Sequence, residues 1–220
     1  MKKDLSGRLV FSPSDLVRHL GSPFASWMDR YALENPGAVT PDEETEDVHL
    51  IAQTGAQHER AVLAEFKSSS LTLVEISTND PVLARAQTQS TIHAKVAIIY
   101  QAALEHGRFA GFADFLLLDE SGRYQVWDTK LARSPKPHYA IQLCCYSEML
   151  SAMTGTPMPE IFGLILGTKD RVAFRVEDFL HYYCHIKANF LAMQEGFTGN
   201  LMDRPEPLPR ADHGRWTSHA

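Results

Sequence analysis

Two aspartates and a lysine in the middle of the sequence have the residue types and spacing of a metal-dependent active site. Asp128 and Lys130 are separated by one residue, and Asp114 precedes them in a neighbouring apolar run. Two carboxylates that converge repel each other unless a cation lies between them, and oxygen ligands favour a hard divalent ion such as Mg²⁺. A lysine beside such an ion can orient or deprotonate water, or stabilise charge on a phosphate. The set therefore indicates hydrolysis of a phosphoester.

A predicted β-hairpin decides whether the two aspartates meet. The runs 108–118 and 124–131 are β-like, and the short loop between them contains glycine, as hairpin connections do. If the hairpin is symmetric about Ser121, Asp114 falls opposite Asp128. Residues paired in this way project from one face of the sheet, with Cβ atoms about 5 Å apart.

Lys130 shares the face of Asp128, because side chains at i and i+2 of a strand point the same way. The neighbouring positions on that face are apolar, which makes burial of three charges costly unless a cation binds there. The alternative is a surface ion pair between Asp128 and Lys130, and a register error of one residue would turn every side chain to the other face. The apolar neighbours are Phe112, Leu116, Leu118 and Val126.

Three further polar residues have helical spacing that could bring them to the same site. His58 falls on the apolar stripe of a helix predicted over 50–67, although a single histidine there is more often a core residue. Gln142 and Tyr146 are spaced i, i+4 and so share one face of the helix after the hairpin. Their polar ends could support the lysine or contact a phosphate, or Tyr146 could be a core aromatic with its hydroxyl at the edge.

The elements that must position these residues are those of an α/β fold. Hydrophobic periodicity and turn residues predict N-terminal helices, an antiparallel three-strand meander, a helix, one or two more strands and a final helix. The region 35–47 and the Pro-rich tail after Gly199 are predicted to be irregular. The predicted helices are 12–20, a segment after Pro23, 50–67, 80–93, 138–153 and 177–195, and the predicted strands are 71–76, 96–104, 108–118, 124–131, 161–166 and 171–176.

Composition is that of one globular domain. The 220 residues carry a net charge of −6, which argues mildly against a general polyanion binder, although acidic metal ligands count as negative in that sum. No apolar run is long enough for a membrane span or secretory signal, so a cytoplasmic location without membrane contact is expected. The three cysteines are expected to be reduced packing residues: Cys144, Cys145 and Cys184.

The motif series resembles the PD-(D/E)xK nuclease superfamily, and within it the RecB-like branch. The series is His58, then Gly111 to Asp114, then Asp128-Thr129-Lys130, then Gln142 to Tyr146. The predicted order of elements is similar to the restriction-endonuclease-like core, in which helices flank a central mixed sheet with an antiparallel meander. The resemblance implies one nuclease domain over 1–220, with an N-terminal helical region (1–50), a core (51–198) and an irregular tail (199–220), possible also as a fragment of a longer protein.

The resemblance also implies roles for individual residues. His58, Asp114, Asp128 and the main-chain carbonyl of Thr129 would bind Mg²⁺ or Mn²⁺, and Lys130 would act on the water and the scissile phosphate. Gln142 and Tyr146 would support the active site. Arg133 and Lys136 are candidates for contact with the phosphate backbone, with a solvated loop as the equal alternative.

The chain departs from the iron–sulfur members of this branch. The positions where they carry cysteines hold Ser22, Ala211, Gly214 and Ala220, none of which can bind a cluster. No iron–sulfur cluster is therefore expected, and the tail is expected to be loosely held.

The expected function is metal-dependent hydrolysis of DNA, with exonuclease favoured over endonuclease on the resemblance, in DNA repair, recombination or defence. The expected partners are single-stranded DNA or duplex ends, and an additional domain or a protein such as a helicase. One alternative is a catalytically silent nucleic-acid-binding or scaffold module that keeps the nuclease fold. The other is a hydrolase of a different phosphoester.

Overall fold

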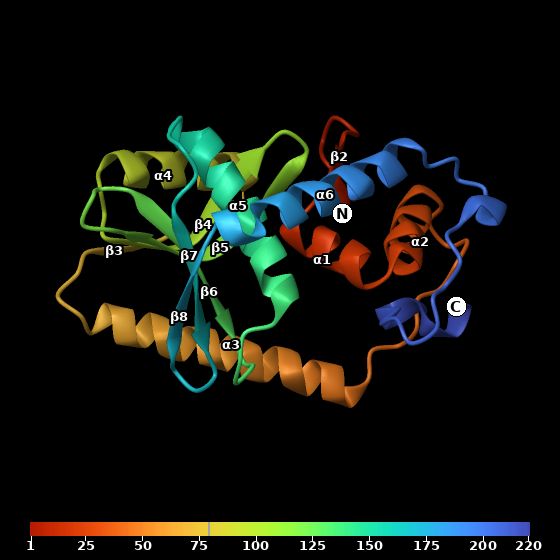
Figure 1. The fold of residues 1–220 in the computed structure, drawn as a ribbon, viewed down its shortest axis with the longest axis horizontal. Helices are drawn as coiled ribbons and strands as arrows, with labels where there is room; N and C mark the ends of the chain where they lie inside the picture. Colours follow the sequence, from red (N-terminus) through yellow and green to blue (C-terminus); the bar gives the residue numbers. More distant parts are fainter. Residues whose placement is uncertain (79) are drawn as a thin grey trace.

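A six-stranded mixed sheet lies at the centre of the structure, a computed structural model in which residues 1–78 and 80–220 are described (Figure 1). Its strand order is β3-β4-β5-β6-β7-β8. The strands are β3 (Leu73–Glu75), β4 (Ile98–His106), β5 (Phe109–Leu118), β6 (Tyr124–Lys130), β7 (Ile161–Leu166) and β8 (Arg171–Arg175). The helices are α1 (Pro13–Gly21), α2 (Pro23–Glu34), α3 (Glu46–Lys67), α4 (Pro81–His93), α5 (Pro137–Thr154) and α6 (Glu177–Glu195).

The sheet topology confirms the predicted meander. β4, β5 and β6 are antiparallel neighbours, whereas β3 runs parallel to β4 and β7 runs parallel to β6. β8 closes the other edge as an antiparallel partner of β7. The fold is thus mixed α/β and consistent with a restriction-endonuclease-like core.

Helices cover both faces of the sheet. α3 packs one face through Val62, Leu63 and Phe66, which form a buried cluster with Ile98, Phe115 and Ile165. α4 and α5 pack against β4 and belong, with α6, to the larger buried cluster on the other face. Figure 1 shows α3 on one side of the sheet and α4 and α5 on the other. The sheet strands therefore present their two rows of side chains to different helices.

The ends of α5, the helix that faces the hairpin, are determined by a proline and a glycine. Pro137 occupies the first turn of α5, a position where the missing N–H of proline costs nothing. Gly155 ends α5 in the left-handed conformation, with φ of 66°, which glycine adopts without strain. These ends set which residues of α5 lie over β6.

One close approach fixes β6 against β7. A Cβ atom at Gly163 would lie 2.3 Å from the ring of Trp127, so the half-buried indole lies directly over the main chain of β7. Trp127 and Gly163 are also partners in the parallel register. Only glycine leaves room for this contact, which holds the residue next to Asp128 in a defined place.

Three sequence expectations outside the tail need correction. Two short N-terminal strands, β1 (Lys2–Lys3) and β2 (Leu9–Val10), form an antiparallel pair that was not predicted. α3 begins at Glu46 rather than near residue 50, within what was expected to be a loop. Among the cysteines, Cys144 and Cys145 are buried but Cys184 is exposed, so the packing interpretation fails for Cys184.

The tail is not loosely held, contrary to expectation. It contains two 3₁₀ turns, η1 (Leu201–Asp203) and η2 (Gly214–His219), and Trp216 is fully buried in a cluster with α2. Ser22 Oγ and His213 Nδ1 form a buried hydrogen bond of 2.8 Å. Ser22 also accepts from the main chain of Ala25 and so caps α2. A serine and a histidine thus join the tail to the helical region.

No helix in the described part of the chain is both long and apolar enough to cross a membrane.

Candidate active site

The hairpin register places the two aspartates opposite each other. Leu118 pairs with Tyr124 and Leu116 with Val126, as expected for symmetry about Ser121. The same register, continued along the strands, brings Asp114 opposite Asp128. Their in-register neighbours Leu116 and Val126 lie in the cluster that α5 covers, so the acidic pair faces α5.

Asp114 is a buried carboxyl group held by its neighbour across the hairpin. Its Oδ2 accepts from the main-chain N–H of Thr129 and from the Thr129 hydroxyl, both at 2.8 Å. Burial, together with the charge of Asp128, nevertheless raises the pKa of Asp114 to about 7. Two ionised carboxylates at this spacing are therefore unfavourable without a cation.

Asp128 is 3% exposed and is paired with Lys130. Lys130 Nζ lies 2.5 Å from Asp128 Oδ2, but this buried oxygen has no hydrogen bond of good geometry among the described residues. Burial alone would lower the pKa of Lys130, yet the charge of Asp128 and contact with it raise the pKa. Lys130 is thus a cation near neutral pH, which suits it to stabilising charge and orienting water rather than to removing a proton.

Residues of α5 surround the lysine. Lys130 Nζ donates to Gln142 Oε1 at 3.2 Å and lies 5.3 Å from the centre of the Tyr139 ring. Tyr146 is buried, and burial followed by the charges of Asp128 and Asp114 raises its pKa, so its hydroxyl remains neutral. A Cβ at Gly111 would lie 3.1 Å from that hydroxyl, so glycine lets β5 approach Tyr146 closely. Gln142 and Tyr146 share one face of α5, as the i, i+4 spacing predicted, and this face lies beside Lys130 and the acidic pair.

His58 lies beside the site and not within its acidic pair. Its Nε2 contacts the main-chain oxygen of Ile165 at 3.2 Å, and Ile165 is the register partner of Thr129. In the described parts of the chain, no three side chains of His, Cys, Asp or Glu converge closely enough to hold an ion together. His58 is therefore next to the strand that carries Thr129, with its ring engaged elsewhere.

An open cleft leads to the lysine. It has a volume of about 770 Å³ and is lined by Lys130, Tyr139 and Gln142, with Arg18 of α1 and Tyr182 of α6 also lining it. Arg133 and Lys136 are exposed in the loop between β6 and α5, and neither is among the described residues that line this cleft. Phe112, expected among the apolar neighbours of the site, is 41% exposed.

Sequence reasoning missed a second polar group, on β4 and α3. Glu59 accepts hydrogen bonds from Tyr100 Oη at 2.7 Å and from Gln101 Nε2 at 2.6 Å. Gln101 has a φ of 54°, unusual for a residue inside a strand, and lies across from Asp114 between two regular pairs. A single amide in the otherwise apolar run 98–104 was the available signal.

The donor set fits a hard divalent cation. Two carboxylates face each other, one of their oxygens is buried without a well-aligned partner, and the carboxyl of Asp114 resists ionisation beside Asp128. Mg²⁺ in proteins is held by one or two carboxylates together with water and substrate phosphates. Asp114 and Asp128 would hold such an ion.

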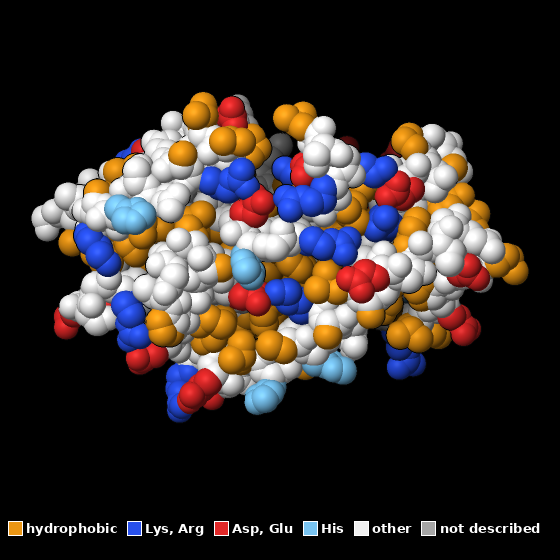
Figure 2. Space-filling view, turned by 90° about the horizontal axis from the view of Figure 1, so that it is seen from above, with side chains coloured by type: hydrophobic (Ala, Val, Ile, Leu, Met, Phe, Trp, Pro, Cys, Tyr) orange, Lys and Arg blue, Asp and Glu red, His pale blue; other side chains and the backbone are white. Residues whose placement is uncertain are grey.

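Figure 2 shows one face of the molecule, on which Lys and Arg side chains gather in the middle with acidic side chains between them. Charge on this face is therefore mixed, in keeping with a net charge of −6.

Comparisons with known proteins point to one family. The family model described as the PD-(D/E)XK nuclease superfamily matches residues 6–207. No curated protein matches the sequence. Among solved structures, one titled "Crystal structure of SSO0001" is similar, with 15% identity, a TM-score of 0.38 and coverage of 86% of this chain and 78% of the other.

Proposed function

The chain belongs to the PD-(D/E)XK nuclease superfamily, and on that premise we propose that it hydrolyses phosphodiester bonds in DNA with the help of Mg²⁺ or Mn²⁺. The observation that carries the proposal is the convergence of Asp114, Asp128 and Lys130 on one face of the hairpin. A bound divalent ion supplies a Lewis acid for the phosphate and lowers the pKa of water.

The residues at the site have separate roles in the proposed hydrolysis. Asp114 and Asp128, with the carbonyl of Thr129, would hold the ion. Lys130 is kept cationic by Asp128 and is aimed by Gln142, so it stabilises negative charge as the phosphate reacts. The neutral hydroxyl of Tyr146 is available as a hydrogen-bond donor at the same face. Positive charge and a neutral donor would thus stand where charge develops.

His58 belongs to this proposal as a further metal ligand. It would have to give up its contact with the carbonyl of Ile165, which lies in the strand next to Thr129.

The finer description rests on the family resemblance and on the cleft. We propose exonuclease action on single strands or duplex ends, with Arg133 and Lys136 binding phosphates at the loop beside the cleft. DNA repair, recombination or defence, a cytoplasmic location and a helicase as partner complete the proposal. The alternative, a silent module that only binds nucleic acid, is disfavoured because Asp114, Asp128 and Lys130 are all present and converge.

Cleavage of labelled DNA tests the proposal. The purified chain is incubated with single-stranded and duplex DNA in Mg²⁺, Mn²⁺ or chelator, beside Asp128→Ala and Lys130→Ala. Cleavage should require metal and fall at least ~100-fold in both variants, since each removes transition-state stabilisation of several kcal/mol. Calorimetry should show weakened metal binding in Asp128→Ala alone.

Two exposed residues provide matched controls. Asp178→Ala and Lys169→Ala remove the same groups from exposed positions on α6 and in the loop between β7 and β8, and both should keep full activity. Thermal melts verify that every variant folds. A folded wild-type chain that binds DNA but cuts none of the substrates with either metal would favour the silent module.

A further inference from the structure

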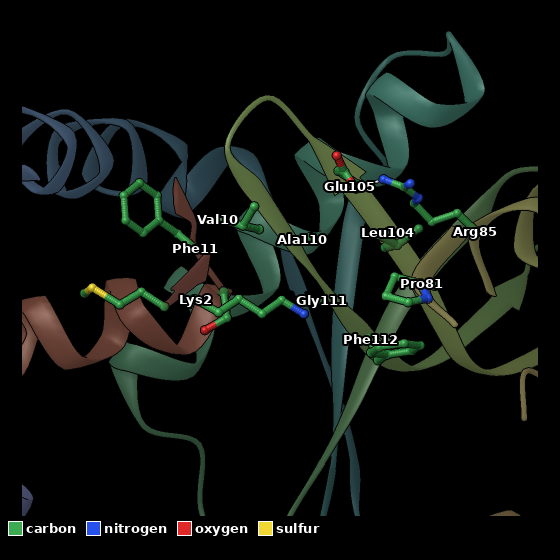
Figure 3. Close-up of a pocket in the computed structure, with 13 residues that line it drawn as sticks. Lys2, Val10, Phe11, Pro81, Arg85, Leu104, Glu105, Ala110, Gly111 and Phe112 are labelled. Carbon is green, nitrogen blue, oxygen red and sulfur yellow. Dashed lines mark ion pairs between the residues drawn. The ribbon is translucent and has the colours of Figure 1, made fainter. Parts of the chain in front are cut away.

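A second cavity lies next to the active site, on the side of β2 and α4. Its volume is about 280 Å³, and its lining is mostly apolar: Val10, Pro81, Leu104, Gly111 and Phe112 all contribute. Figure 3 shows Pro81 and Phe112 near each other on one side of the space, with Lys2 reaching toward Gly111 from the other. We call it the Phe112 cavity. It has room for about nine waters at roughly 30 Å³ each, the size of a flat ring system and too small for a duplex.

Basic residues stand at the mouth of the Phe112 cavity. Lys2 and Arg85 line it, and Arg85 forms an ion pair with Glu105, which also accepts from Arg8 at 3.3 Å. Glu105 is therefore paired with two arginines, and Arg8 also contacts Asp4, while Lys2 lines the cavity as a further cation. A ligand with an apolar ring and an adjoining anionic group matches this arrangement.

The Phe112 cavity shares a wall with the active site. Gly111 lines the cavity, and a Cβ built on it would lie 3.1 Å from the hydroxyl of Tyr146. Phe112 precedes Asp114 by two residues on β5, a separation of about 6.6 Å at ~3.3 Å per residue. A single nucleotide spans such a distance from its base to its phosphate. A ligand in the cavity could therefore be covalently joined to a phosphate at Asp114.

We propose that the Phe112 cavity binds one unpaired nucleobase of the strand being cut, next to the scissile phosphate. The inference rests on the proposed function and specifies its substrate. Phe112 offers an exposed aromatic ring for stacking, which tolerates any base because every base has a π-face. Lys2 and Arg85 line the cavity and would contact the flanking phosphates. Because the space excludes a base pair, the strand must be unpaired at that position.

Steady-state cleavage of single strands by Phe112→Ala, Phe112→Tyr and wild type tests this inference. The alanine variant should raise KM at least 10-fold with a smaller effect on kcat, because binding of the base is lost, and the tyrosine variant should restore KM. Strands with one abasic site, moved stepwise past the scissile bond, should abolish the difference between wild type and Phe112→Ala at a single position. Leu83→Ala, at an exposed apolar position of α4 outside the cavity lining, is the control and should match wild type.

A binding readout separates failure of this inference from failure of the proposed function. Strands with 2-aminopurine at successive positions are titrated into Lys130→Ala, in which cleavage is blocked. Quenching at one position should disappear when the Phe112→Ala substitution is combined with Lys130→Ala in one chain. This result supports the base site whether or not the wild type cuts DNA. Unchanged KM in Phe112→Ala, or quenching that is independent of Phe112, overturns it, while metal-dependent cleavage by wild type would leave the proposed function intact.

Discussion

Thr129 donates two hydrogen bonds to a single oxygen of Asp114, one from its main chain and one from its hydroxyl, each 2.8 Å long. Both bonds favour the ionised form of the carboxyl group. Burial and the charge of Asp128 favour the protonated form more strongly, and the pKa of Asp114 settles at about 7. Thr129 therefore limits how far that pKa rises.

Thr129→Val should shift the pH dependence of metal binding and cleavage to higher pH. Valine keeps the branched shape and the main-chain donor but loses the hydroxyl bond. A hydrogen bond to a charged group contributes about 1.5–3 kcal/mol, which corresponds to a midpoint roughly one to two pH units higher. Thr129→Ser retains the hydroxyl and should behave as wild type. Identical pH–rate profiles for the valine and serine variants would contradict this role.

Asp114→Asn should make the metal-free protein more stable than wild type at alkaline pH. The folded-state pKa of Asp114, about 7, lies above its usual value of 3.8, so the native state holds a proton that the unfolded state has released. Stability from this group is present at low pH and is lost as pH rises from about 4 to 7, by up to ~1.4 kcal/mol per pH unit. Asparagine carries no such titration.

Urea unfolding at pH 5 and pH 8 in chelator measures the effect of Asp114→Asn. The difference in unfolding free energy between variant and wild type should grow toward pH 8 and shrink when Mg²⁺ is added to the wild type. A difference that stays constant with pH would show that the carboxyl group is not held protonated.

Gln142→Leu should slow cleavage by about 10- to 100-fold without weakening metal binding. The amide oxygen orients the ammonium group of Lys130, and loss of one charge-assisted hydrogen bond costs about 1.5–3 kcal/mol. Single-turnover rates and calorimetric metal titration separate the two quantities. Gln89→Leu, at an exposed position of α4, is the matched control. Loss of metal affinity in Gln142→Leu would indicate that this residue supports the carboxylates instead.

Trp216→Ala should lower the unfolding free energy by about 3–5 kcal/mol, the usual cost of deleting a buried large aromatic. Trp216 is fully buried against α2, and its indole N–H donates to Asp29 at 2.8 Å. Met202→Ala, at a position that is 84% exposed, should change stability by less than about 0.5 kcal/mol. Thermal and urea unfolding compare the two. Equal small effects would mean that the tail folds independently of α2.

The parts of the fold that could be predicted from sequence are those encoded locally. The hairpin register followed from a short glycine-containing loop between β-like runs, and β7 from an uninterrupted apolar run. β1 and β2 are too short to have a periodicity. The tail was predicted to be irregular because its composition is Pro-rich. Trp216 and His213 hold it through long-range contacts with the helical region, and such contacts cannot be predicted from composition.

The site divides in the same way. Asp114, Asp128 and Lys130 were predicted from strand pairing and alternation. Helical spacing predicted that Gln142 and Tyr146 share one face, and the family resemblance implied their role in the site. The structure brings these five residues together. The place of His58 could not be predicted, because a helical stripe shows which residues face inward but not what the ring touches there. Glu59 was missed because adjacent residues of a regular strand point to opposite faces, whereas Tyr100 and Gln101 both reach Glu59 at a point where Gln101 has a φ of 54°.

The contact between Trp127 and Gly163 fixes a fluorophore one residue away from the proposed metal ligand Asp128, on the opposite face of the sheet. Trp127 is adjacent to Asp128 in the chain, whereas Trp27 and Trp216 lie together in the cluster formed by α2 and the tail. Indole emission responds to nearby charge, so binding of an ion at Asp128 should alter the signal of Trp127 while the other two tryptophans provide a constant background. Binding of a metal ion could therefore be followed by tryptophan fluorescence, in the unlabelled protein and without a substrate.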